Sequence, residues 1–172
     1  MLLFDIRTAL SKAVQVDGTL EADDAVWQDG DARPAASVQV TGRLSPAGHG
    51  TLYLSGHLAG DAHAECRRCL ADIAVPVADD VQLVFAEADA EGADDPDVYP
   101  LDPQAGSLDL RPAIREQWLL AVPAYALCRE DCKGLCSTCG ANLNEGPCRC
   151  ERTPDPRWAA LSKLGTQGTD RS

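Results

Sequence analysis

The chain has 172 residues, of which 45% are hydrophobic and 24% are charged, and its formal net charge is −12. This length and balance predict one globular domain, with at most a small appendage, and a core that needs no disulfide staples. No stretch approaches the ~18 apolar residues of a membrane helix, and the start, MLLFDIRTAL, lacks a secretory pattern, so we expect a cytoplasmic protein without a membrane partner.

The negative charge is concentrated in the first two thirds of the chain. Residues 1–110 carry 6 Lys and Arg against 20 Asp and Glu, a balance of −14, whereas residues 111–172 carry 9 against 7, a balance of +2. An acidic surface repels the phosphate backbone, which disfavours broad nucleic-acid binding. A basic protein is a better-matched partner for this part, although the charge is equally compatible with a role in solubility alone.

Residues 1–85 predict a β-rich body. VQVTGRL (38–44) and TLYLSGHL (51–58) alternate apolar and polar residues as strands do, and SPAGHG between them has the Pro and Gly of a hairpin loop. Gly60 and Asp61 predict a further turn, and Pro76 predicts a sheet edge or a bulge. The expected fold class is α+β, with an antiparallel body that forms a curled sheet or a small barrel.

The second half of the chain divides into four predicted segments. Residues 86–107, with seven acids, three prolines and no Lys or Arg, predict an acidic mobile loop. Residues 108–123 predict the main helix, which packs on the body and ends before Pro123. Residues 124–164 predict a cysteine-rich, zinc-binding segment and a short helix capped by Asp155. Residues 165–172 predict a disordered tail.

Eight cysteines carry the clearest chemical signal. Two stand in CRRC, and six follow within 23 residues, with the spacings Cys66-x2-Cys69 and Cys128-x3-Cys132-x3-Cys136-x2-Cys139-x8-Cys148-x-Cys150. Thiols of a cytosolic chain stay reduced, which opposes disulfides. A Cys-x2-Cys turn followed by Gly, as in CSTCG, is typical of a zinc knuckle. The sequence therefore favours metal over disulfides.

Because zinc takes four ligands, eight thiols predict two structural zinc ions. We expect one site of Cys136, Cys139, Cys148 and Cys150. The other would join Cys66 and Cys69 to Cys128 and Cys132, and so attach the body to the C-terminal segment. One site with spare thiols is the alternative partition. An iron–sulfur cluster is compatible with the ligand type, but the spacings differ from those of ferredoxins.

Nothing in the sequence predicts catalysis. His63 and Glu65 directly precede Cys66, whereas a zinc deaminase has its His-x-Glu and its cysteines on separate helices. Four-thiolate sites leave no coordination position open for water, and phosphate loops and nucleophile elbows do not occur. We expect a protein that is not an enzyme and has no small-molecule substrate.

Three stretches, CRRCL, LLAVPAYALCREDCKGLCSTCGANLNEGPCRC and DPRWAALSKL, carry a resemblance. From about Ala64 to Leu164 the chain resembles the YceD-like family of bacterial and plastid proteins, named for the accumulation of large-subunit ribosomal RNA. The resemblance implies a role in biogenesis of the large ribosomal subunit and in 23S rRNA levels, without catalysis. The partner would be a subunit precursor or a basic ribosomal protein.

Two other functions stay open at this point. One is direct rRNA binding through the arginines and the lysine beside the cysteines, which are Arg67, Arg68, Arg129, Lys133, Arg149 and Arg152. These cations could equally offset the −2 charge of a four-thiolate zinc site. The other is a thiol- or metal-responsive regulator that uses exposed cysteines.

Overall fold

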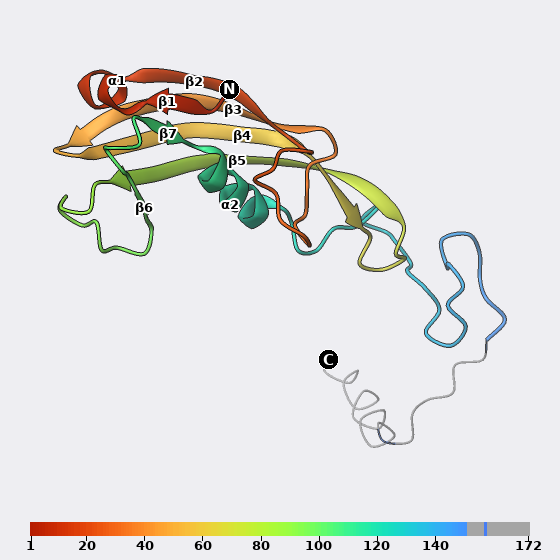
Figure 1. The fold of residues 1–172 in the computed structure, drawn as a ribbon. Helices are drawn as coiled ribbons and strands as arrows, with labels where there is room; N and C mark the ends of the chain where they lie inside the picture. The colour runs from red at the N-terminus through yellow and green to blue at the C-terminus, as the bar shows by residue number, and fades with distance from the viewer. Residues whose placement is uncertain (151–156, 158–172) are drawn as a thin grey trace, which may run out of the picture.

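The structure is a computed structural model, which describes residues 1–150 and Arg157 (Figure 1). Its centre is a five-stranded sheet in the order β2-β3-β4-β5-β6. Neighbouring strands are antiparallel except β5 and β6. The sheet is open, because β2 and β6 end the order without pairing to each other, so a curled sheet is present rather than a barrel. The strands are β2 (Val14–Glu21), β3 (Ser37–Gly48), β4 (Thr51–Glu65), β5 (Asp72–Ala86) and β6 (Val98–Pro100).

Two helices and a strand pair complete the body, and the predicted α+β class is confirmed. Strand β1 (Leu3–Asp5) pairs antiparallel with β7 (Ser107–Asp109). Helix α1 (Ile6–Ser11) begins where the Asp5 carboxylate accepts the Thr8 N–H at 2.7 Å. Helix α2 (Arg111–Ala121) ends at Val122, which is extended before Pro123 as predicted. Neither α1 nor β2 was predicted; the alternation of β2 is hidden because Gly18 occupies an inward position.

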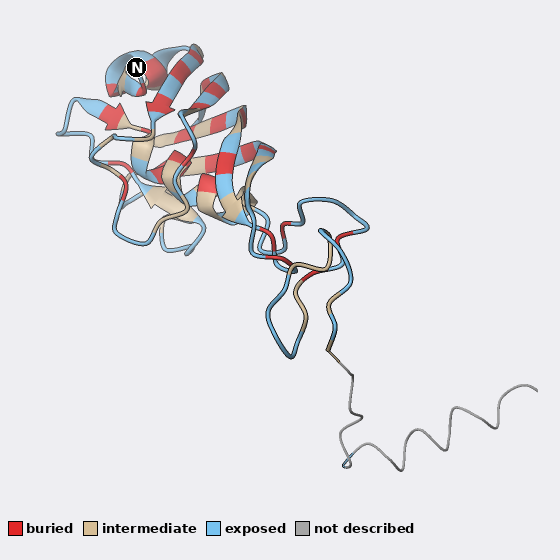
Figure 2. Cartoon of the chain, turned by 90° about the vertical axis from the view of Figure 1, so that its right-hand side faces the viewer, coloured by how far each residue is buried: buried red, intermediate tan, exposed pale blue. Residues whose placement is uncertain are grey.

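The core lies between the sheet and α2. Buried and exposed residues alternate along β3 and β4 as predicted, with Leu44, Leu54 and Leu58 fully buried. Figure 2 shows such alternation as bands of red and pale blue along the strands of the sheet. The turn predicted at Gly60–Asp61 is wrong, since β4 continues without interruption to Glu65. Gly60 stands there because a Cβ would lie 2.8 Å from the Ser37 carbonyl oxygen and 3.2 Å from the Trp118 ring. Pro76 lies in β5, where β5 pairs with β4 alone, as predicted for a sheet edge.

The connection from β2 to β3 is clamped onto α2. Arg115 forms a bidentate pair with Asp31, with Nε–Oδ2 at 2.6 Å and NH2–Oδ1 at 2.7 Å. The Trp118 indole N–H donates to the Ala32 carbonyl at 2.7 Å. Hydrogen bonds from Arg115 are the main reason that the pKa of Asp31 lies below its ordinary value of 3.8.

This pair predicts a pH dependence of stability. A carboxylate whose pKa is lowered by folding stabilises the fold above its ordinary pKa and loses that contribution as pH falls below it. We expect Asp31→Asn to destabilise the protein at pH 7, and the difference from the parent to shrink below about pH 4. Urea unfolding of both proteins between pH 7 and 3 measures it. A difference that is unchanged across this range would contradict the assignment.

The acidic segment 86–107 contains β6, and turns link β6 to β5. The Phe85 and Tyr99 rings pack with centroids 5.4 Å apart, and Leu101 is buried. The mobility of segment 86–107 and the predicted limits of the segments stay predictions. The predicted helix with its Asp155 cap and the predicted tail at 165–172 lie outside the described residues. Within the described part, no helix is long and apolar enough to cross a membrane.

Candidate metal centres

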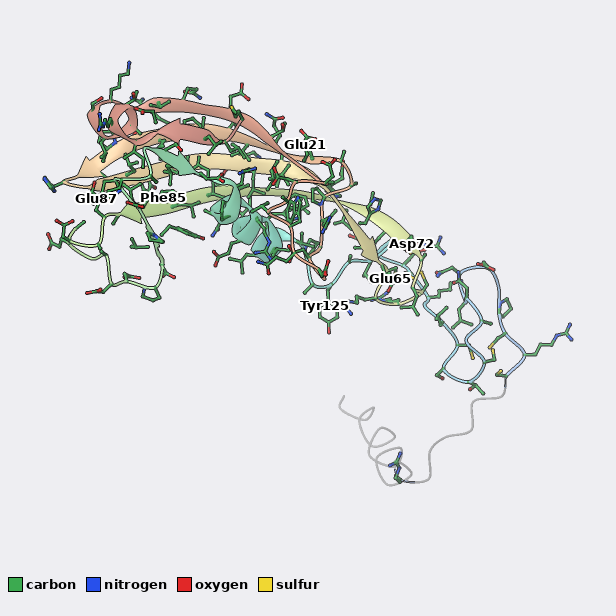
Figure 3. All side chains as sticks on the ribbon, in the orientation of Figure 1. Glu21, Glu65, Asp72, Phe85, Glu87 and Tyr125 are labelled. Atoms are coloured by element: carbon green, nitrogen blue, oxygen red, sulfur yellow. The ribbon has the colours of Figure 1, made fainter. Side chains whose placement is uncertain are left out.

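The first centre joins the far end of the β4–β5 hairpin to the segment after α2. Cys66 and Cys69 stand in the turn between Glu65 and Asp72, which are labelled in Figure 3. Cys128 and Cys132 reach them from the C-terminal segment, and the four Sγ atoms all lie within 4.8 Å of one another. Three of these thiols are buried and Cys128 is exposed. Ile73 and Leu135 pack against the buried three.

The second centre lies wholly within the C-terminal segment, which extends away from the body (Figure 1). Cys136, Cys139, Cys148 and Cys150 bring their Sγ atoms within 4.8 Å of one another. Cys139 is exposed and the other three are half-buried. The structure thus brings the eight thiols together in the two groups that the sequence predicted. That they bind metal stays a prediction.

The distances between sulfurs fit four-thiolate coordination. With metal–sulfur bonds of ~2.3 Å, a tetrahedron places neighbouring sulfurs roughly 3.8 Å apart. The Sγ atoms of Cys66 and Cys132 lie 3.8 Å apart, and those of Cys69 and Cys128 lie 3.7 Å apart. A disulfide would require ~2.05 Å. The donor set and the spacing therefore suit a thiophilic ion such as zinc.

The two Cys-x2-Cys loops have the same backbone design. In CRRCLA the Cys66 N–H donates to the Ala71 carbonyl at 2.9 Å, and in CSTCGA the Cys136 N–H donates to the Ala141 carbonyl at 2.8 Å. The next residue after each second cysteine has a positive φ, 59° at Leu70 and 73° at Gly140. The sequence shows this similarity only as Cys-x2-Cys-x-Ala. The shared backbone geometry indicates that both loops present their thiols in the same way.

Leu70 is the strained member of this pair. The left-handed conformation costs a residue with a side chain roughly 1–2 kcal/mol, whereas glycine adopts it freely. Leu70 is 59% exposed, so its side chain contributes little packing in return. We expect Leu70→Gly to raise stability by about 1 kcal/mol, and Gly140→Leu to weaken the second loop. Thermal unfolding in saturating zinc compares them, and a lower Tm for Leu70→Gly would contradict the argument.

Each centre mixes thiols that ionise easily with thiols that resist ionisation. The Cys128 amide is the main cause that lowers the pKa of Cys66 to about 6, and the Thr138 amide does the same for Cys136, also to about 6. A hydrogen bond with Cys132 raises the pKa of Cys128 to about 12. One with Cys139 raises the pKa of Cys150 to about 12. Four adjacent thiolates repel each other, so a bound dication would be needed to keep all four ionised.

The basic residues beside the cysteines hold the backbone together. Arg68 donates to the carbonyls of Glu130 and Cys132, at 3.2 and 2.9 Å. Arg67 donates to the Ala124 carbonyl at 2.9 Å, and its guanidinium lies 5.8 Å from the centre of the exposed Tyr125 ring. Asn144 donates a side-chain N–H to a thiol of the first centre, since its Nδ2 lies 3.4 Å from Cys132 Sγ. Sequence reasoning missed it, since an Asn in a loop carries no distinguishing signal.

Comparison with known proteins assigns the chain to a protein family. The family model described as large ribosomal RNA subunit accumulation protein YceD matches residues 54–165. The chain belongs to the YceD family. The matched residues include most of β4, all of β5, helix α2 and all eight cysteines. The predicted family is therefore confirmed.

Relatives occur in bacteria and chloroplasts. An uncharacterized protein of Mycobacterium tuberculosis is 32% identical over 127 residues, which cover 71% of this chain and 59% of the relative. The protein YlbN of Bacillus subtilis is 24% identical over 94% of both chains. The Arabidopsis thaliana protein named large ribosomal RNA subunit accumulation protein YCED homolog 1, chloroplastic, is 36% identical over 66 residues, or 38% of this chain and 21% of the relative. No solved structure matches significantly.

Proposed function

We propose that this protein is a non-enzymatic, cytoplasmic factor in biogenesis of the large ribosomal subunit, required for normal accumulation of 23S rRNA. Membership of the YceD family carries the proposal, since the family and its chloroplast members are named for large ribosomal RNA subunit accumulation. The acidic balance of residues 1–110 supports a basic ribosomal protein, or a precursor particle that displays one, as the partner.

Each centre would hold one structural zinc ion through its four thiolates. Such an ion has no open position for water, so it would supply folding energy rather than catalysis. The first centre would fix the C-terminal segment to the end of the β4–β5 hairpin, and the second would give that segment its own shape. A rigid arm beside an acidic body would then be available for a partner.

Direct rRNA binding through the arginines is the main alternative. The structure favours it less, because Arg67 and Arg68 already donate to backbone carbonyls that hold the two segments together. The two ideas differ in salt dependence: phosphate contacts give an affinity for RNA that falls steeply with ionic strength. Binding of purified protein to 23S rRNA that persists near physiological salt and shows this slope would support the alternative.

The direct test is sedimentation of the tagged protein from a native lysate on a sucrose gradient, with and without RNase. Co-migration with large-subunit precursors, together with reduced 23S rRNA in a deletion strain, is the expected result. Normal levels of mature and precursor 23S rRNA in the deletion strain would overturn the proposed function. A thiol-responsive regulator would instead show thiols that react with an alkylating agent before any chelator is added.

A further inference from the structure

Asn144 belongs to the loop of one centre but contacts the other. It lies between Cys139 and Cys148 in the chain, within the second centre. Its Nδ2 nevertheless points to Cys132 Sγ of the first centre at 3.4 Å. Asn144 is half-buried, so this hydrogen bond is partly shielded from water. The side chain is therefore a physical link between the two groups of thiols.

The orientation of the Asn144 amide is fixed by its other partners. Its Oδ1 accepts the Lys133 backbone N–H at 2.8 Å and the Arg129 guanidinium at 2.9 Å. Both groups can only donate, so the atom that faces them must be the oxygen, and the NH2 group is left for the sulfur. A further hydrogen bond fixes the same NH2 group, because Asn144 Nδ2 also donates to Asn142 Oδ1 at 2.8 Å.

The backbone ties the second loop to the first centre at the same place. The Leu143 N–H donates to the Gly134 carbonyl at 2.9 Å, and the Leu135 N–H donates to the Arg68 carbonyl at 3.0 Å. Gly134 also lies so close to Arg68 that a Cβ would stand 2.9 Å from its carbonyl oxygen. These backbone hydrogen bonds hold the loop that carries Asn144 against the first centre. A metal ion bound by Cys139 and Cys148 would fix both ends of that loop.

We propose that Asn144 couples the two metal centres, so that metal at the second centre strengthens metal binding at the first. An N–H donated to a ligating thiolate spreads its negative charge and fixes the orientation of the sulfur. By reciprocity, metal at the first centre strengthens binding at the second by the same factor. This inference rests on the proposed metal binding. It makes Asn144 a positioning residue for Cys132, not a ligand.

Competition for zinc by graded chelators tests the coupling in the full chain. In Asn144→Ala we expect the affinity of the first centre to fall 10–100-fold, the usual effect of losing an outer contact to a ligand. Asn144→Asp keeps the oxygen that faces Lys133 but removes the N–H that faces Cys132, so it should weaken the first centre at least as much. Ser137→Ala is the matched control: this exposed residue of the same segment contributes no group to the contact between Asn144 and Cys132, so the affinity of the first centre in this variant should match that of the parent.

A double-mutant cycle separates coupling from a local effect. Cys148→Ser removes a ligand of the second centre and should weaken the first centre when Asn144 is present, but have little further effect in the Asn144→Ala chain. Circular dichroism of the sheet confirms that each variant is folded. Equal effects of Cys148→Ser in both backgrounds, or a first-centre affinity in Asn144→Ala within twofold of the parent, would overturn the coupling. In those cases the parent still binds two ions, whereas a parent chain that takes up no metal refutes the metal binding itself.

Discussion

Replacing Cys66 by serine should destabilise the body far more than replacing Cys136 by serine. Cys66 is fully buried and follows β4 directly, so the first centre is continuous with the sheet. Cys136 lies in the extended C-terminal segment. Structural zinc binds with about 10–16 kcal/mol in small domains. We expect Cys66→Ser to lower the free energy of unfolding of the body by several kcal/mol, which is part of this binding energy. Cys136→Ser should lower it much less.

Thermal unfolding in saturating zinc and limited proteolysis measure the difference. Cys66→Ser should lower the Tm of the sheet and expose the chain between α2 and Cys132 to cleavage, because the hairpin no longer retains that segment. Cys136→Ser should be cleaved only within the second centre. Equal losses of Tm in the two variants would show that the first centre does not attach the segment to the body.

The second large effect is expected at Trp118. This side chain is fully buried, packs on Gly60 and donates its indole N–H to Ala32. Trp118→Ala should lower the free energy of unfolding by about 3–5 kcal/mol, since truncation of a buried aromatic leaves a cavity. Trp118→Phe keeps most of the ring but leaves the Ala32 carbonyl without its donor, at a cost of about 1–3 kcal/mol.

Leu120→Ala provides the control on the same helix. Leu120 is 73% exposed, so its truncation should change stability by no more than about 0.5 kcal/mol. Urea unfolding of the three variants and the parent gives the comparison. If the free energies of unfolding of Trp118→Ala and Leu120→Ala lie within about 1 kcal/mol of each other, roughly twice the size of a surface effect, α2 does not anchor the core.

The sequence predicted the parts of the fold whose pattern is local. The strands that contain Leu44 and Leu54 alternate clearly, and Pro123 ends α2, so periodicity and proline stereochemistry were sufficient there. The turn at Gly60–Asp61 was wrong because the glycine allows close contacts with the distant Ser37 carbonyl and Trp118 ring, which no local pattern reveals. The clamp between Arg115 and Asp31 joins residues 84 positions apart and has the same limitation.

The grouping of the cysteines was predictable because coordination number limits the choices. Four ligands for each ion and the short gap between Cys139 and Cys148 define the second group, and with two ions CRRC then joins Cys128 and Cys132. One site with spare thiols was the alternative that the sequence left open. The identical design of the two loops, the strain at Leu70 and the contact of Asn144 with Cys132 depend on backbone geometry. These features became visible only in three dimensions.

Mass spectrometry of the intact protein under native conditions, with elemental analysis of the same sample, tests the central claim most directly. We predict two zinc ions for each chain, one after Cys148→Ser, and no visible absorption from iron and sulfide. A chain that carries no metal, or a single ion that survives removal of Cys148, would contradict the account of two four-thiolate centres.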